Sequence, residues 1–123
     1  MHIQESGEMY LETIHILKKR MGNVRAIDVA SEMNFSKPSV SRALGILREN
    51  GYIAVDKNGY ITLNNSGREI AEKIYERHTL LTEFFISIGV PNEVAQDDAC
   101  KIEHHISDET FKAIKAFAQK KGG

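Results

Sequence analysis

Three side chains with metal-binding chemistry lie about one helical turn apart in the last quarter of the chain. Cys100, Glu103 and His104 follow one another at i, i+3 and i+4, so on a helix all three leave the same face. Thiolate, carboxylate and imidazole together are typical of a transition-metal site rather than of a calcium or magnesium site. The triplet alone is also explained by a core cysteine beside a surface Glu–His pair, so further donors are needed to decide for a metal site.

Other parts of the chain add donors of the same kind. His78 lies on an apolar stripe between Ile74 and Leu81, and Met9 and Glu12 share a helix face at i, i+3. If Met9, Cys100 and His78 are buried, Glu103 and His104 lose hydration beside them and need a partner that offsets this cost. A metal ion is such a partner. The sequence therefore predicts a metal site with six candidate ligands: Met9, Glu12, His78, Cys100, Glu103 and His104.

The remaining histidines and the lack of catalytic motifs argue against further metal ligands and against an enzyme. His2 is terminal, His15 has a solvated helix position, and His105 points about a quarter-turn away from His104. The chain has no His-Glu-x-x-His motif and no Gly-rich phosphate loop. A site with six protein ligands also leaves no open coordination position. We therefore expect neither an enzyme nor an organic small-molecule substrate.

Hydrophobic periodicity predicts the helices that position these groups. A first helix over 7–20 has an apolar stripe, and a short second one contains Ile27, Ala30 and Met33. A third helix, 36–49, is expected to begin at Ser36 as N-cap, with Pro38 in its first turn. In the second half we expect helices over 66–88, 93–105 and 108–119, with Ser66–Glu69 as a capping box and Ser107 as a cap.

Between the third and fourth helices the hydrophobic period changes from 3.6 to 2. The runs 52–55 and 60–63 flank Asp56-Lys57-Asn58-Gly59, and an Asn-Gly pair between two such runs predicts a β-hairpin. Three helices followed by a hairpin are the order of a winged helix. The fold class is therefore mainly α with a small β-hairpin: an N-terminal winged helix-turn-helix over residues 1–65 and a helical domain over 66–123.

In a helix-turn-helix, the second helix of the pair enters the major groove and presents its N-terminal side chains to the bases. Here that helix is 36–49, and the wing adds a basic residue. The predicted DNA contacts are Ser36, Lys37, Pro38, Ser39, Ser41, Arg42 and Lys57. A capped, solvated surface helix is the alternative interpretation of these polar residues.

Composition limits the other classes of function. The chain has 123 residues and a net charge of -1, which argues against a protein that coats nucleic acid indiscriminately. No apolar run is long enough for a membrane span, and Met1–Glu5 lacks the features of a signal peptide. With one cysteine, Cys100, no internal disulfide forms. We expect a cytoplasmic protein without membrane contacts.

Taken together, these motifs resemble the diphtheria-toxin-repressor family of metal-dependent transcriptional regulators, over nearly the whole chain. The resemblance rests on Glu8–Leu11, Ser36–Ser41, Arg77-His78, and Asp98–Cys100 followed by Glu103-His104. It implies a winged helix followed by a helical dimerisation domain, with metal bound between them. It also implies a homodimer that represses metal-homeostasis genes by binding a palindromic DNA operator when loaded with ferrous iron or manganese.

The resemblance assigns the ligands to two branches of that family. The regulatory site of the iron-responsive branch matches Met9, Cys100, Glu103 and His104 by position. Glu12 and His78 match ligands of the manganese-responsive branch. Because sulfur donors favour Fe(II), we expect Fe(II) as the preferred metal and Mn(II) as the alternative.

The chain also departs from the family pattern. The iron branch has an ancillary metal site with a carboxylate where this chain has Thr82 and a histidine where it has Gln96, so we expect that site to be absent or altered. The SH3-like third domain of longer members is not expected in this short form. A metal-independent winged-helix regulator with a structural Cys/Glu/His cluster is the alternative function.

Overall fold

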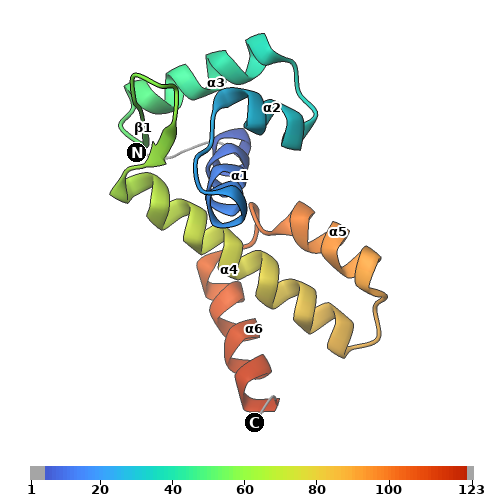
Figure 1. Cartoon of the computed structure of the whole chain (residues 1–123). Helices are drawn as coiled ribbons and strands as arrows, with labels where there is room; N and C mark the ends of the chain where they lie inside the picture. Colours follow the sequence, from blue (N-terminus) through green and yellow to red (C-terminus); the bar gives the residue numbers. More distant parts are fainter. Residues whose placement is uncertain (1–4, 122–123) are drawn as a thin grey trace. The chain divides into compact units, whose positions relative to one another are not determined.

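The computed structural model describes residues 5–121. His2 and most of the segment used for the signal-peptide prediction fall in residues 1–4, outside the described range. The chain divides into two compact units, Met1–Lys73 and Ile74–Gly123, and the division falls inside one long helix. The elements in chain order (Figure 1) are α1 (Glu5–Met21), α2 (Ala26–Met33), α3 (Lys37–Glu49), β1 (Ile53–Val55), β2 (Ile61–Leu63), α4 (Asn65–Ser87), α5 (Asn92–Ile102) and α6 (Asp108–Lys121).

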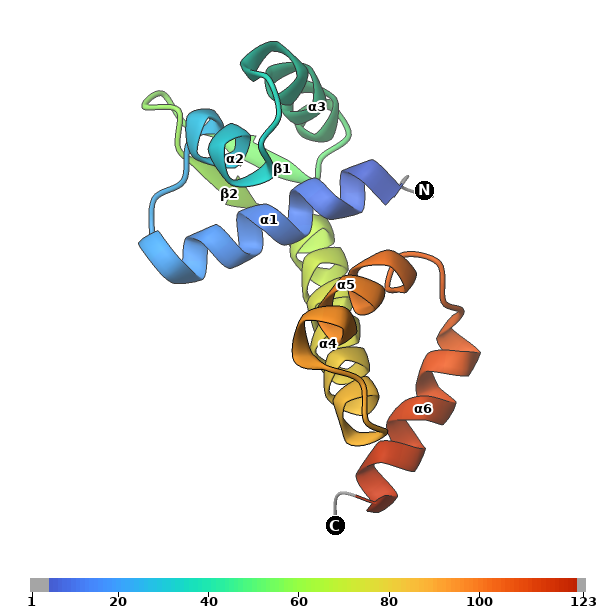
Figure 2. The same ribbon diagram turned by 90° about the vertical axis from the view of Figure 1, so that its right-hand side faces the viewer.

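The first unit is the predicted winged helix. Helix α1 packs on α2, α3 and β2, and α3 packs on α2 and β1. One apolar cluster joins them, and Leu11, Ile14 and Val29 in it are completely buried. The hairpin is tied to the helices by its backbone: the N–H of Ile61 donates to the carbonyl of Val24 at 2.8 Å. Both views place the hairpin turn and α3 at the same end of this unit (Figures 1 and 2).

The start of α3 follows from its sequence. The Ser36 side chain accepts a hydrogen bond from the N–H of Ser39 at 3.3 Å, and Pro38 occupies the first turn, where no donor is lost. The buried residues of α3 are Val40, Leu44 and Leu47, as the periodicity predicts. The opposite side of the helix is therefore left to solvent.

The predicted hairpin is confirmed, with Ile53 opposite Leu63 and Val55 opposite Ile61 in an antiparallel pair. Its turn is organised by Asp56, whose Oδ1 accepts from the N–H groups of Asn58 and Tyr60 at 2.8 and 2.9 Å. Gly59 takes a φ of 84°, which a non-glycine residue rarely adopts. Asn58 is not in that conformation, so the turn depends on the aspartate and the glycine rather than on a type I′ Asn-Gly pair.

The second unit contains the later turns of α4 together with α5 and α6. Ser107 caps α6 as predicted, since its Oγ accepts from the N–H of Thr110 at 3.1 Å. The buried apolar residues of the unit include Leu81, Ala95 and Phe111. No helix among residues 5–121 is both long enough and apolar enough to cross a membrane.

Some local predictions are wrong. Helix α5 ends at Ile102 rather than at 105. Helix α4 begins at Asn65, so Ser66 is not its cap; the Ser66 hydroxyl instead donates to the carbonyl of Gly51 at 3.1 Å. Four large apolar side chains whose helical spacing favours burial are nevertheless exposed: Met21, Ile27, Ile88 and Phe117.

Candidate functional site

Glu103 is the centre of the candidate site in the second unit. It follows the last residue of α5 and keeps helical backbone angles, with its N–H donating to the carbonyl of Ala99 at 2.9 Å. Its side chain is completely buried. A buried carboxylate is costly unless a cation or strong donors compensate for its lost hydration, so the neighbours of this group decide what it does.

Two imidazoles flank the Glu103 carboxylate, one at each oxygen. His78 Nδ1 lies 2.8 Å from Oε2, and the His78 side chain is 28% exposed. His104 Nε2 lies 3.4 Å from Oε1, and its side chain is 1% exposed. Helix α4 therefore supplies one nitrogen donor, and the turn after α5 supplies a carboxylate and a second nitrogen donor.

The side of the carboxylate that faces His104 fits a divalent metal ion. Glu103 Oε1 makes no hydrogen bond within residues 5–121. Two N or O ligands of one transition metal, each about 2.0–2.2 Å from the ion, lie roughly 3–3.5 Å apart. The separation between Glu103 Oε1 and His104 Nε2, 3.4 Å, is of that size. The donor set of carboxylate and imidazole suits iron, manganese and zinc.

Cys100 is placed differently from the prediction. Its side chain is exposed, so the expectation that it is buried is wrong. It lines a shallow cleft of 350 Å³ with His78, Glu93, Gln96 and Asp97. His78 thus borders the cleft with Cys100 and also bonds Glu103. Cys100 and Glu103 therefore have different surroundings, since the first is exposed and the second is completely buried, although their helical spacing predicts a shared site.

Met9 and Glu12 belong to α1 in the first unit, three residues apart and both half-buried. The carbonyl of Met9 accepts a hydrogen bond from Thr13 Oγ1 at 2.8 Å. Their spacing puts them on one helix face, as predicted. Their part in a metal site stays a prediction.

Arg77 is a buried residue that positions the turn carrying Glu103 and His104. It is 5% exposed, and its Nη1 donates to the carbonyls of Glu103 and Ile106 at 3.0 and 2.8 Å. Its Nη2 donates to Asp108 Oδ1, and its guanidinium lies over the ring of Phe111. One buried arginine thus fixes the turn that carries Glu103 and His104. The sequence signal for Arg77 is its place in the Arg77-His78 pair, one of the motifs on which the family resemblance rests.

All the predicted DNA contacts lie in the first unit and are exposed. Ser36 and Ser39 are engaged with each other at the helix cap, with 2.9 Å between their hydroxyl oxygens. Lys37, Ser41 and Arg42 lie on the first turns of α3, outside the contact between Ser36 and Ser39. Lys57 is in the hairpin turn. Their contact with DNA stays a prediction.

Comparisons with known families match both halves of the chain. Residues 2–61 match the N-terminal DNA binding domain of iron dependent repressors. Residues 64–121 match the iron dependent repressor metal binding and dimerisation domain.

Individual relatives agree with these matches. The chain is 34% identical to the transcriptional regulator MntR of Escherichia coli O6:H1 over 98% of its own length and 78% of that protein. It is 30% identical to an uncharacterised HTH-type transcriptional regulator of Methanocaldococcus jannaschii over 96% of both chains. Its fold matches a manganese-dependent transcriptional repressor in complex with manganese, with a TM-score of 0.81 and 28% identity over 89% of this chain. The chain spans about half, 51%, of that solved structure.

Proposed function

Because the chain belongs to the family of iron-dependent repressors, the diphtheria-toxin-repressor family of metal-dependent transcriptional regulators, we propose that it binds a DNA operator as a homodimer when a divalent transition metal is bound. In this proposal the first unit contacts DNA through α3, and the second unit supplies four of the six metal ligands. The operator is palindromic and controls metal-homeostasis genes, so that metal loading represses them.

The observation that carries this proposal is the buried Glu103 carboxylate with an imidazole at each oxygen. His78, Glu103 and His104 are the proposed ligands of the second unit. A bound divalent cation supplies the positive charge that a buried carboxylate needs. Arg77 orients the turn that carries two of these ligands, through the carbonyls of Glu103 and Ile106. Met9, Glu12 and Cys100 are the further proposed ligands.

We propose Fe(II) as the metal, because Met9 and Cys100 offer sulfur, which favours iron over manganese. Mn(II) is the alternative. Two observations favour Mn(II). The donors of His78, Glu103 and His104 are nitrogen and oxygen atoms. A relative that is 28% identical in sequence is described as manganese-dependent. The exposed position of Cys100 reduces the weight of the sulfur argument.

Metal binding in the second unit is coupled to DNA binding in the first in this proposal. Such couplings are typically about 1–3 kcal/mol, or roughly 5–150-fold in affinity. The experiment starts from chelated protein kept without oxygen. An operator is first selected from a random duplex pool with metal-loaded protein, and duplex binding is then followed by fluorescence anisotropy during parallel Fe(II) and Mn(II) titrations.

The matched variants are Glu103→Gln, which keeps the shape of the side chain and removes its charge, and Glu109→Gln, an exposed control in the same unit. We expect metal to increase DNA affinity in the wild type and in Glu109→Gln, and to have little effect in Glu103→Gln. DNA binding that is equally strong with and without metal in all three proteins would refute the switch. It would instead support a winged-helix regulator in which His78 and Glu103 form a structural pair.

A further inference from the structure

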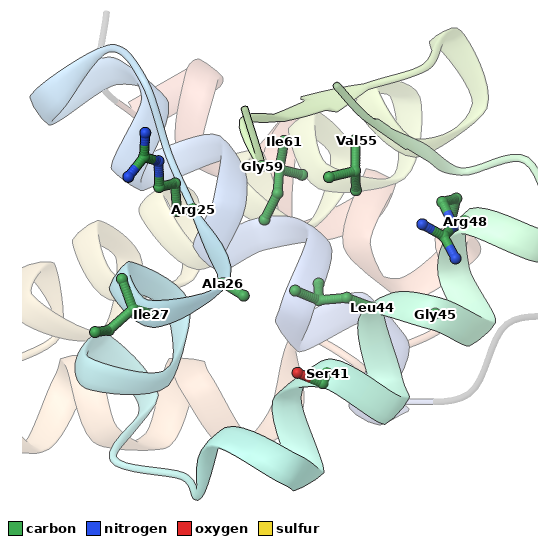
Figure 3. Close-up of a pocket in the computed structure, with 10 residues that line it drawn as sticks. All are labelled: Arg25, Ala26, Ile27, Ser41, Leu44, Gly45, Arg48, Val55, Gly59 and Ile61. Atoms are coloured by element: carbon green, nitrogen blue, oxygen red, sulfur yellow. The ribbon is translucent and has the colours of Figure 1, made fainter. Parts of the chain in front are cut away.

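A groove in the first unit lies between α3, the start of α2 and the hairpin (Figure 3). Its volume is 390 Å³. Leu44, Val55 and Ile61 form an apolar floor, and Figure 3 shows Arg25 and Arg48 on opposite sides of it. The groove therefore combines an apolar surface with a cationic group at each side.

The charge of this groove suits an anionic partner. Among the described residues that line it, two are basic and none is acidic. The Arg25 guanidinium is held in place, since it lies 4.7 Å from the centre of the Tyr60 ring and its Nη2 donates to the Tyr60 hydroxyl at 3.3 Å. Arg48 is exposed in the last turn of α3. Guanidinium groups bind phosphate through paired N–H donors, so these two residues are suited to phosphate oxygens.

Gly45, in the middle of α3, is a second and independent indication. Glycine destabilises a helix interior relative to alanine, and Gly45 does not have a positive φ that requires it. A Cβ atom added at Gly45 meets nothing within 4 Å, so packing among the described residues does not require glycine either. Because Gly45 has no side chain and Ser41, one turn earlier, has a small one, the α3 side of the groove is open. Such a bare stretch of helix lets a partner approach closely.

The geometry of duplex DNA identifies the partner. A helix such as α3 enters the major groove, and the hairpin of a winged helix lies beside it. The major and minor grooves are separated by a single sugar–phosphate strand. A strand that borders the groove occupied by α3 therefore passes between α3 and the hairpin, where this groove is.

We propose that the groove receives one sugar–phosphate strand of duplex DNA, with Arg25 and Arg48 binding its phosphates and Gly45 giving it room. The apolar floor then faces deoxyribose. This inference rests on the proposed DNA-binding function and adds two phosphate contacts that lie outside the predicted set on the first turns of α3. Because phosphates carry no sequence information, both contacts contribute equally to any duplex.

The test uses the full metal-loaded protein and a fluorescent duplex of arbitrary sequence, several helical turns long. Affinity is measured over a series of salt concentrations for the wild type, Arg25→Gln, Arg48→Gln and the control Arg20→Gln, an exposed arginine outside the groove. Each groove variant is expected to lower the slope of log affinity against log salt by about one. Each is also expected to weaken binding at low salt about tenfold.

Gly45→Ala separates binding from folding, because the two effects have opposite signs. Alanine is expected to raise the melting temperature of the free protein by about 4 °C. It is also expected to weaken binding of the same duplex, since its methyl group occupies the proposed path of the strand. A variant that is more stable and yet binds more weakly is not explained by a loss of structure.

The outcomes distinguish this inference from the function on which it rests. A wild type that binds no duplex at any salt concentration overturns the proposed function and this inference with it. A wild type that binds, with salt slopes for Arg25→Gln and Arg48→Gln equal to that of Arg20→Gln, overturns this inference alone. Unchanged DNA affinity in Gly45→Ala also overturns the proposed path of the strand.

Discussion

Arg77 and Glu103 are joined through the backbone: Arg77 Nη1 donates to the carbonyl of Glu103 at 3.0 Å, while the next residue, His78, bonds the Glu103 side chain at 2.8 Å. Two consecutive residues of α4 thus hold both ends of one buried residue. The position of the carboxylate therefore depends on the arginine, although the arginine is not a proposed ligand.

Replacing Arg77 by lysine tests this relationship. Lysine keeps the charge but cannot donate to Glu103, Ile106 and Asp108 from one planar group. We expect the unfolding free energy of the metal-free protein to fall by about 2–3 kcal/mol, and metal affinity to fall roughly tenfold. Urea unfolding and metal titration measure the two effects. Arg68→Lys, an exposed position on the same helix, is the control; similar losses in both variants would contradict the specific role of Arg77.

The first turns of α4 depend on a close approach at Gly67. A Cβ atom at this position would lie 2.3 Å from the carbonyl oxygen of Tyr52, which is backbone and cannot rotate away. We therefore expect Gly67→Ala to destabilise the protein by about 2–3 kcal/mol or more, even though alanine favours helix. Thermal unfolding measures this change. Gly45→Ala is the matched control, since its Cβ meets no atom within 4 Å; equal melting temperatures in the two variants would refute the steric argument.

The sequence predicts the elements of the first unit well because their signals are local. Ser36 and Pro38 fix the start of α3, and the hairpin lies where two runs of period 2 flank Asp56 to Gly59. These signals need only neighbouring residues, so no knowledge of the tertiary structure is required. Burial at the outer ends of helices is different, since the apolar residue Ile88 is exposed in spite of its favourable spacing.

The candidate site could be predicted only in part. The spacing of Glu103 and His104 indicates metal-binding chemistry, and the structure brings them together with His78. The burial of Glu103 and the exposure of Cys100 could not be derived, because helical spacing does not say which side chains the tertiary packing covers. The role of Arg77 was also hidden, since its partners include backbone carbonyls that any residue provides.

His15 gives the first unit a dependence on pH. Partial burial lowers the pKa of His15 below its usual 6.5, and the charge of Lys19 lowers it further, while Glu72 acts in the opposite direction and Arg68 adds to the lowering. The native state therefore binds this proton less readily than the unfolded chain does. The contribution of His15 to stability is complete above about pH 6.5. It falls as the pH drops below that value and becomes constant once the native imidazole is protonated.

The variant His15→Gln removes this titration. We expect the unfolding free energy of the metal-free variant, measured with urea over a pH series, to decrease less than that of the wild type between roughly pH 7 and 5. His105→Gln, an exposed histidine in the other unit, is the control. A pH dependence in His15→Gln as steep as that of the wild type would show that other groups cause it.

Cys100 decides between the two proposed metals. Because its side chain is exposed, Cys100→Ser is expected to change the unfolding free energy of the metal-free protein by less than about 0.5 kcal/mol. If the thiolate binds the metal, Fe(II) protects Cys100 of the wild type from a thiol reagent, and Co(II) gives a thiolate charge-transfer band that Cys100→Ser lacks. Removing the sulfur then lowers the affinity for Fe(II) more than that for Mn(II), because manganese prefers oxygen and nitrogen donors. Cys100→Asp, which offers oxygen in place of sulfur, should shift the preference further towards Mn(II).

A thiol that reacts equally fast with and without metal, together with an unchanged ratio of the two affinities in Cys100→Ser, would remove Cys100 from the ligand set. The donors at His78, Glu103 and His104 would then favour Mn(II) as the metal of this protein.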